Sequence, residues 1–415
     1  MATQQLQKPL TGVRVVDFSR VLAGPFLSMM LGDLGAEVIK IEHPKRGDDT
    51  RAWGPPFVHG MEDKGMSAYF ACVNRNKKSL ALDLKDKRGA AVAKRLVTDP
   101  KTHIVVENFK VGGMGSYGLD YATVSKIHPA LIMCSVTGFG QTGPYKDRPG
   151  YDLAIQAMSG LMSITGQASG EPQKVGVAIS DVIAGLFAGN GVLAALYQAE
   201  KTGVGQHVDI SLLDTQISSL VNIASNYLTT KQVPTRMSNA HPTIVPYQDC
   251  TASDGYFVIA CGNDGQFAKL ASLLEHPEWA TDEKFATNPA RVRNREELMA
   301  LLNTEFSKQT ATSWVERLLE VGVPAAPIND MGQALNDEHI RARGLVQELT
   351  FKDEAQNILG SIEMVGSPLK LSGSSMERVE SPPPFVGEHT EEVLRDILSM
   401  DELEIASLRD SGVIR

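Results

Sequence analysis

The stretch GVRVVDFSRVLAGPFLSMMLGDLGAEVIKIE, residues 12–42, reads as a strand, a helix and a second strand. Val13–Phe18 is a short β-branched run of the kind found in buried parallel strands, and Glu37–Glu42 is a second one. Between them Phe26–Leu34 predicts a helix, with Pro25 at the first helical position. A strand, a helix and a strand within about 30 residues predict a right-handed βαβ unit.

The same alternation continues along the first half of the chain. We expect helices over Gly89–Val97 and Tyr121–Ile127, between strand candidates. These strand candidates are Ser79–Leu84, His103–Glu107, Leu131–Val136 and His207–Leu212. The pattern predicts an α/β fold with a large, open, doubly wound parallel sheet.

The chain has 415 residues, a length that favours two domains. Residues 1–227 are predicted to form the first part of the large domain, and residues 228–330 a smaller α/β domain, because prolines and charged helices begin near 228. Residues 331–415 are predicted to be a linker and C-terminal helices that return to the large domain.

Composition excludes several classes of partner. With 40 Lys and Arg against 49 Asp and Glu, the net charge of −9 argues against nucleic-acid or anionic-membrane binding. The four cysteines form no CxxC pair and the histidines no HxxxH or HxH pair, so no metal site is expected. No signal peptide, transit peptide or uninterrupted apolar span is recognisable. We therefore expect a cytoplasmic protein, or a mature mitochondrial matrix protein.

Two sequence features have both a structural and a functional interpretation. Asp181 begins the longest predicted helix, Asp181–Lys201, which is apolar nearly all round and is therefore expected to be buried. Asp181 is either the N-cap of this helix or a carboxylate nucleophile that the helix N-terminus keeps ionised. The basic run Asn74–Lys78 is either a solvated surface or a phosphate clamp.

A GxGxxG pattern at Gly138–Gly143 follows a strand, but Pro144 and Asp147–Gly150 favour a turn where a dinucleotide-binding helix should begin. A nicotinamide-dependent dehydrogenase is therefore a weak alternative. The sequence contains neither GxSxG nor GxxxxGK[ST], which disfavours a serine hydrolase and a P-loop ATPase.

Several motifs together resemble the family III CoA-transferases, also called the CaiB/BaiF family. The resemblance covers essentially the whole chain. Its motifs are Gly12–Phe18, Leu22–Pro25, Leu34–Glu42, Asn76–Ser79, Leu82–Lys85, Glu107–Phe109, Gly138–Tyr145, Arg148–Asp152, Thr202–Asp209 and Gly387–Thr390.

The resemblance implies a mechanism in which an aspartate carries CoA from an acyl-CoA donor to a free carboxylic acid. The matching residue is Asp181, which favours the nucleophile over the helix cap. The family pattern implies no tightly bound cofactor, metal or ATP, with coenzyme A as a co-substrate. It also implies a homodimer of two interlocked ring-shaped chains.

The resemblance also assigns residues that contact CoA or border the active site. Tyr151 and Asp152 match positions beside the site. Two positions depart from the pattern, because His43 and Ser116 stand where an Arg is common, and Lys45, Arg46 or Lys110 could substitute. The CoA positions are Leu22, Ala23, His43, Leu82, Lys85, Asn108 and Phe109.

The same fold is used by α-methylacyl-CoA racemases, which need a histidine base where this chain has Tyr151, a phenol with an ordinary pKa of about 10. A transferase is therefore favoured over a racemase. A CoA-binding paralogue without activity is the other alternative. Asn239–Tyr247 resembles the relatives that use succinyl-CoA and dicarboxylic acids, and His241 in it is a candidate for acceptor specificity.

Overall fold

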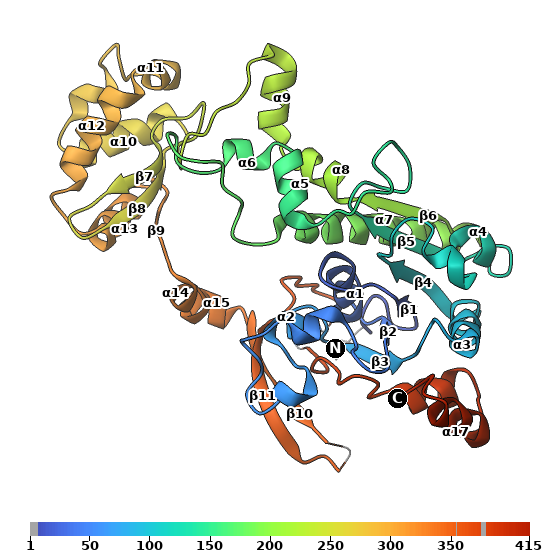
Figure 1. Cartoon of the computed structure of the whole chain (residues 1–415). Helices are drawn as coiled ribbons and strands as arrows, with labels where there is room; N and C mark the ends of the chain where they lie inside the picture. Colours follow the sequence, from blue (N-terminus) through green and yellow to red (C-terminus); the bar gives the residue numbers. More distant parts are fainter. Residues whose placement is uncertain (1–6, 354, 375–378) are drawn as a thin grey trace. The chain divides into compact units, whose positions relative to one another are not determined.

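The structure, a computed structural model, describes residues 7–353, 355–374 and 379–415 (Figure 1). The chain forms two compact units. The first contains the residues up to Leu161, Val175–Lys231 and the residues from Glu338 onward, and the second contains Met162–Lys174 and Gln232–Asp337. The segment Met162–Lys174, placed in the large domain by the sequence analysis, thus groups with the second unit, which ends at 337 rather than 330.

The first unit is built on a six-stranded sheet with the order β3-β2-β1-β4-β5-β6, and every neighbouring pair is parallel. This confirms the predicted open parallel sheet. The strands are β1 (Arg14–Asp17), β2 (Glu37–Glu42), β3 (Lys77–Ala81), β4 (Thr102–Glu107), β5 (Ile132–Thr137) and β6 (His207–Ser211). The third strand starts and ends earlier than the predicted Ser79–Leu84, and Leu82, just after it, forms an isolated bridge with Ile414.

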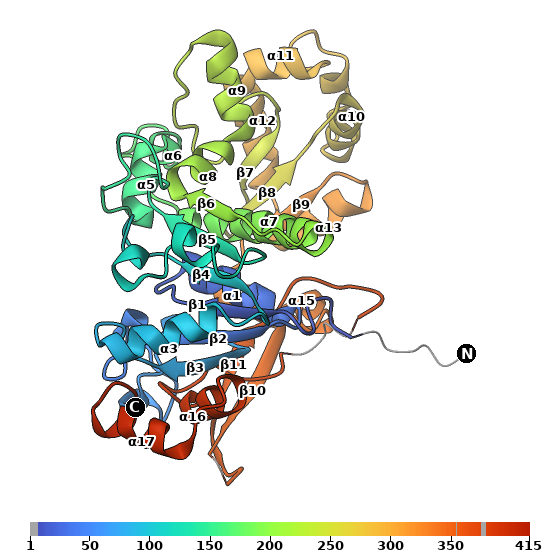
Figure 2. The ribbon, with the colours of Figure 1, turned by 90° about the vertical axis from the view of Figure 1, so that its right-hand side faces the viewer.

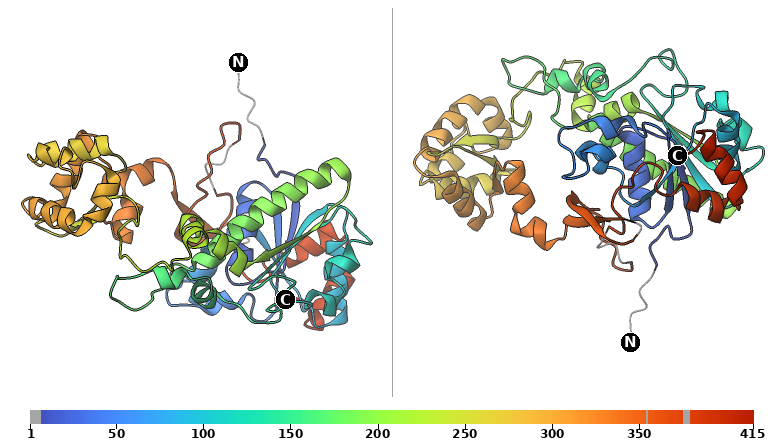
Figure 3. Two further views of the ribbon diagram at one scale, coloured as in Figure 1. Left: turned by 90° about the horizontal axis from the view of Figure 1, so that it is seen from above. Right: turned by 60° about the horizontal axis from the view of Figure 1, so that its bottom comes forward.

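Helices cover both faces of this sheet (Figures 2 and 3). On one face α1 (Ala23–Asp33) and α7 (Ile179–Thr202) share a buried core with residues of β1, β2, β4 and β5. On the other face α3 (Lys87–Val97), α4 (Tyr121–Val124) and α17 (Glu402–Asp410) share a second buried core. The sheet is therefore doubly wound, as predicted.

Helix α1 begins earlier than the predicted position of Pro25. The Phe26 N–H donates to the Leu22 carbonyl at 2.7 Å and closes the first turn, so the helix starts at Ala23. Pro25 is tolerated there because the first N–H groups of a helix have no partner within it.

The C-terminal segment contacts the first unit through hydrogen bonds to the strand β3 and to Arg51. The Thr390 hydroxyl accepts the Ala81 N–H at 3.1 Å, and the Arg51 side chain donates to the Pro384 carbonyl at 2.9 Å. The remaining elements of this unit are α2 (Ala68–Ala71), α5 (Asp152–Met158), α8 (Leu212–Ser218), α9 (Val221–Thr230), α15 (Glu338–Ala342), β10 (Val346–Lys352), β11 (Ile358–Val365) and α16 (Thr390–Glu392), while α6 (Leu161–Ile164) lies at the unit boundary.

Helix α7 is buried on one face only, whereas its apolar sequence predicted burial all round. Apolar side chains remain exposed along its other face, namely Leu186, Phe187, Leu193 and Tyr197. By length and composition, α7 is also the one helix in the described part of the chain that could cross a membrane. In the structure it packs on α1, β5 and β6.

The second unit has a three-stranded antiparallel sheet, ordered β7-β8-β9, with helices packed around an apolar core that includes Phe257, Phe306 and Trp314. Its elements are β7 (Tyr247–Thr251), β8 (Tyr256–Ala260), α10 (Asp264–Leu273), α11 (Asn288–Arg293), α12 (Arg295–Phe306), α13 (Ala311–Glu320), β9 (Ala325–Pro327) and α14 (Met331–Asn336).

Candidate active site

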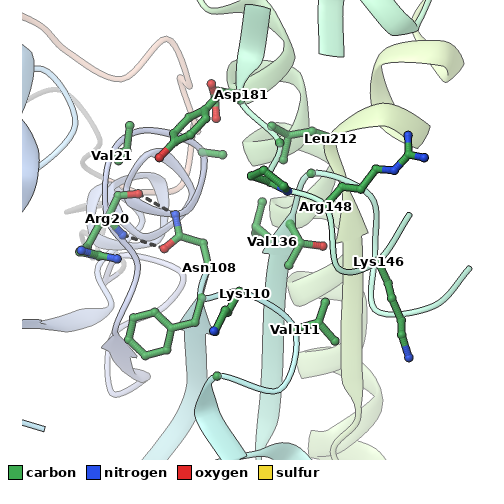
Figure 4. Close-up of a pocket in the computed structure, with 18 of the residues that line it drawn as sticks. Arg20, Val21, Asn108, Lys110, Val111, Val136, Lys146, Arg148, Asp181 and Leu212 are labelled. Carbon is green, nitrogen blue, oxygen red and sulfur yellow. Dashed lines mark hydrogen bonds between the residues drawn. The ribbon is translucent and has the colours of Figure 1, made fainter. Parts of the chain in front are cut away.

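A cavity of about 710 Å³ lies in the first unit, where the chain leaves the carboxyl ends of β1 and β4. These two strands are neighbours in the sheet, and the strand order reverses between them, which is where open α/β sheets bind ligands. The cavity is lined by Arg20, Val21, Leu22, Ala23, Asp49, Asn108, Phe109, Lys110, Val111, Gly113, Ser116, Tyr117, Val136, Thr137, Gly138, Lys146, Asp147, Arg148, Pro149, Gly150, Tyr151, Asp181 and Leu212 (Figure 4).

Asn108 joins the turn after β1 to the loop after β4. Its Oδ1 accepts the Arg20 N–H at 2.9 Å, and its Nδ2 donates to the Arg20 carbonyl at 2.6 Å (Figure 4). A single side chain therefore satisfies both backbone groups of Arg20 and fixes one wall of the cavity.

Asp181 lies in the first turn of α7 and does not cap the helix, so the cap interpretation was wrong. The helix begins at Ile179, and its N-cap position, Ala178, supplies no side-chain hydrogen bond. Instead Oδ1 of Asp152, at the start of α5, accepts the Ser180 N–H at 2.9 Å. Because Asp152 satisfies this helix N–H, the Asp181 carboxylate is free to face the cavity.

Burial, and after it the nearby charge of Asp152, raises the pKa of Asp181 to about 7, although a hydrogen bond with the Ala23 backbone N–H acts in the opposite direction. In the nucleophile interpretation of the sequence, the helix N-terminus keeps this group ionised. The structure corrects that expectation, because desolvation and a like charge outweigh the favourable N–H groups.

Gly185 allows α7 to approach the beginning of α1. A Cβ atom on Gly185 would lie 2.9 Å from Phe26 Cδ1 and 3.0 Å from the Ala23 carbonyl oxygen. At Gly189 the nearest atom to such a Cβ would be 3.7 Å away, an ordinary contact. Since Gly185 lies about one helical turn after Asp181, its missing side chain places the carboxylate beside Ala23.

We predict that Gly185→Ala lowers kcat/KM by about tenfold or more, because the added methyl group must separate α7 from Ala23, and small displacements of reacting groups are costly. Gly189→Ala is the matched control: it should keep near wild-type activity and raise the melting temperature slightly, since Ala favours helix more than Gly does. Steady-state kinetics and thermal melts of both variants check this. Equal activity of the two variants would contradict the proposed close approach.

Five of the residues that the sequence analysis selected line the cavity together with Asp181: Leu22, Ala23, Asn108, Phe109 and Tyr151. Asp152 lies beside them, since it contacts Ser180 and its charge acts on Asp181. Tyr151 is 69% exposed.

Four other selected residues do not line this cavity. His43 accepts the Lys45 N–H on its Nδ1, Leu82 is only 2% exposed in the core, and Lys85 is exposed. His241 belongs to the second unit, where its ring packs against Tyr247 with centroids 5.2 Å apart. Their roles toward CoA or an acceptor stay predictions.

Tyr69 lies outside the cavity lining but near enough to Asp181 for the carboxylate charge to act on it, and the sequence did not indicate this. Burial first, and then the charge of Asp181, raises its pKa to about 12, so the phenol stays protonated near the carboxylate. Its ring meets Trp53 edge-on at 5.1 Å. Because α2 has only four residues and no motif surrounds it, no sequence signal could have placed Tyr69 there.

The GxGxxG stretch behaves as its turn residues predicted. After β5 the chain forms turns, and the next helix, α5, begins only at Asp152. A Cβ atom on Gly138 would lie 2.6 Å from the Gly150 Cα, so this glycine permits two loop segments of the cavity wall to touch. Within the described residues, no three His, Cys, Asp or Glu side chains gather as a metal site.

Known proteins are similar in sequence to this chain over nearly its whole length. The chain matches the family described as CoA-transferase family III over residues 10–390. It is 43% identical to a succinate–glutarate CoA-transferase of Agrobacterium fabrum, over 95% of this chain and 96% of that protein. It is 44% identical to a succinyl-CoA:glutarate CoA-transferase of Mus musculus, over 98% and 90%.

Among solved structures, a CaiB/BaiF family protein from Brucella suis has a TM-score of 0.82 and 43% sequence identity, over 94% of this chain and 100% of that one. The fold, the family match and these relatives agree with one another and confirm the resemblance found in the sequence. The chain belongs to CoA-transferase family III and is a CoA-transferase.

Proposed function

We propose that this protein transfers CoA from succinyl-CoA to a small dicarboxylic acid through an aspartyl-CoA thioester on Asp181. The observation that carries the proposal is the Asp181 carboxylate itself, which lines the cavity at the sheet's switch point. The names of the relatives, which act on succinate and glutarate, support the donor and the class of acceptor.

The proposed chemistry balances without a metal or ATP. The Asp181 carboxylate attacks the thioester carbonyl, which forms a mixed anhydride and expels CoA thiolate. The thiolate then attacks the aspartyl carbonyl, giving the aspartyl-CoA thioester and releasing succinate. An acceptor carboxylate attacks this thioester, CoA thiolate leaves again, and the thiolate attacks the acceptor carbonyl to give the new acyl-CoA and free Asp181.

The Ala23 backbone N–H suits the charge changes in these steps. It acts on the Asp181 carboxylate in the resting structure and lowers the pKa of that group, and Ala23 and Asp181 both line the cavity. During attack on the aspartyl carbonyl, negative charge develops on an oxygen of the same group, and a fixed N–H donor stabilises it without reorganisation.

We predict that kcat/KM rises about tenfold per pH unit below pH 7 and levels off above it, because only the ionised carboxylate is a nucleophile and its pKa is raised to about 7. Initial rates at low succinyl-CoA concentration from pH 5 to 9 measure this rise, the acid limb of the pH profile. A flat profile across pH 5 to 7 would show that an ordinary carboxylate, or another group, carries the reaction.

Lys110, Lys146 and Arg148 bring positive charge to the cavity and are candidates for the CoA phosphates. Removing one charge-assisted contact, as in Lys110→Met, should raise KM for succinyl-CoA by about tenfold and change kcat little. Lys87→Met is the control, since Lys87 is exposed on α3 and lies outside the cavity. A KM increase of the same size in both variants would contradict a specific contact.

The direct test of the proposed function is a donor and acceptor panel. Purified protein is given succinyl-CoA with acids of two to six carbons, carrying one or two carboxylates, and the acyl-CoA products are followed by mass spectrometry. Turnover restricted to dicarboxylates supports the proposal, and equal turnover of monocarboxylates contradicts it. The same panel with His241→Ala tests this residue as a determinant of acceptor preference.

We also propose a homodimer. The exposed apolar side chains of α7, named above, support it because a folded chain rarely leaves such a face in water. Sedimentation equilibrium should give twice the 44.9 kDa of the chain, and a mass of one chain at micromolar concentration contradicts the dimer.

A further inference from the structure

The turn between β1 and α1, residues 18–22, leads directly to Ala23, which lines the cavity together with Asp181. Within it Val21 has φ = 73°, a left-handed conformation that β-branched residues rarely adopt. Such a backbone persists only where its surroundings hold it in place, and strained residues of this kind cluster at functional sites.

A buried ion pair between Lys40 and Asp48 contacts this turn. Lys40 on β2 donates from Nζ to the Ser19 carbonyl at 2.8 Å, and the same Nζ lies 2.9 Å from Asp48 Oδ2. Among the described residues, Asp48 Oδ2 has no hydrogen-bond partner besides this ammonium group. Neither side chain of the pair is exposed to solvent.

The other carboxylate oxygen of Asp48 reaches the strained residue itself. Oδ1 accepts the Thr50 N–H at 2.9 Å and the Val21 N–H at a longer 3.4 Å. Lys40 and Asp48 therefore contact the turn on both sides of Arg20, whose own backbone groups are held by Asn108.

We propose that the Lys40–Asp48 ion pair positions the turn so that the Ala23 N–H stays directed at Asp181. The inference rests on the proposed function of Asp181. Neither residue lines the cavity, so both act through the turn and are positioning residues rather than catalytic ones. Buried ion pairs contribute little net stability, which leaves conformational specificity as their benefit here.

Other charges near the pair and near Asp181 have to be considered in any pH test. Lys40 also faces Asp17 on β1 and Glu42 on its own strand. Asp17 in turn faces Lys77 on β3. Asp181 faces Asp152 on α5 and Tyr69 on α2.

The decisive variants are the charge-neutral double Lys40→Met/Asp48→Asn and the single Asp48→Asn. Loss of the Ala23 N–H contact should move the acid limb of kcat/KM to higher pH by about half a unit or more, because that hydrogen bond lowers the pKa of Asp181. The plateau rate should fall by about tenfold or more. In Asp48→Asn, removal of a negative charge alone would move the limb to lower pH, so an upward shift separates positioning from electrostatics.

The matched control is Arg75→Met/Asp33→Asn. It removes another buried ion pair, at 2.6 Å, from the opposite end of α1 and touches neither the turn nor the cavity. This control variant should be less stable than the wild type. Its acid limb of kcat/KM should lie at the wild-type pH, and its plateau rate should be within about threefold of the wild-type rate.

Three results would overturn the inference. The first is an acid limb of kcat/KM at the wild-type pH in both test variants. The second is an upward shift of the same size in the control variant. The third is failure of Asp48→Asn to fold, because the pair would then serve folding itself, and Lys40 still faces two carboxylates in this variant. The wild-type assay separates the two proposals: no CoA transfer contradicts the proposed function and this inference together, whereas normal transfer with unmoved variant limbs contradicts this inference alone.

Discussion

Asp181→Asn is expected to lower CoA transfer by at least about a thousandfold while the protein stays folded. An amide cannot attack the thioester to form the anhydride, so neither half of the proposed reaction can begin. The assay is succinyl-CoA consumption with a dicarboxylic acceptor, measured beside circular dichroism and thermal melting.

The matched control is Asp214→Asn, since Asp214 also lies in the first turn of a helix, α8, and is exposed outside the cavity. It should keep wild-type rates. A folded Asp181→Asn protein that transfers CoA at a near wild-type rate would remove Asp181 from the mechanism and make Asp152 the next carboxylate to test.

Stability gives a second readout of the same substitution. The folded protein raises the pKa of Asp181 to about 7 from the ordinary 3.8, so it favours the neutral carboxyl. The contribution of this group to folding stability is therefore fully present below about pH 4 and is lost as the pH rises through 7. Asp181→Asn, which is neutral throughout, should accordingly melt at a temperature equal to or above that of the wild type at pH 8.

The second large effect is expected for Asp152→Ala. Oδ1 of Asp152 accepts the Ser180 N–H, and its Oδ2 accepts a hydrogen bond from the Gln156 amide at 2.8 Å. The Gln156 amide oxygen accepts the Val175 N–H at 2.9 Å, so these two side chains hold the segment that enters α7. Truncation should displace Asp181 and lower kcat/KM by about a hundredfold.

Asp152→Asn separates the hydrogen bond from the charge. Its amide oxygen can still accept the Ser180 N–H, but the negative charge that raises the pKa of Asp181 is gone. This variant should keep the plateau rate within about tenfold and move the acid limb of the pH profile to lower pH. An unmoved limb would contradict the coupling between the two carboxylates, and wild-type activity in Asp152→Ala would contradict the positioning role.

The sheet was predictable because each strand is a compact β-branched run between turn residues. β2 matches its predicted bounds, Glu37–Glu42, and β1 and β4 lie within a residue or two of theirs. The burial of α7 was not predictable in the same way. A helix that is apolar on every side indicates burial, but nothing in its periodicity says that the face with Leu186 and Tyr197 stays exposed in the single chain.

The candidate site shows a similar division. Leu22, Ala23 and Asn108 follow strands directly, and chain topology brings the ends of parallel strands together, so motif and fold together predicted them. Asp152 as the partner of α7 and Tyr69 beside the carboxylate depend on tertiary packing between segments far apart in sequence. The same packing determines the pKa of Asp181, which the sequence alone could not indicate.

The most direct test of the account is to find where CoA becomes attached. Wild-type protein incubated with succinyl-CoA alone, without an acceptor, is treated with hydroxylamine or borohydride, digested and examined by peptide mass spectrometry. We expect modification of the peptide that contains Asp181, as a hydroxamate or as the reduced alcohol, and none in Asp181→Asn. Modification of a different residue, or none at all while the same preparation transfers CoA, would contradict the aspartyl-CoA intermediate.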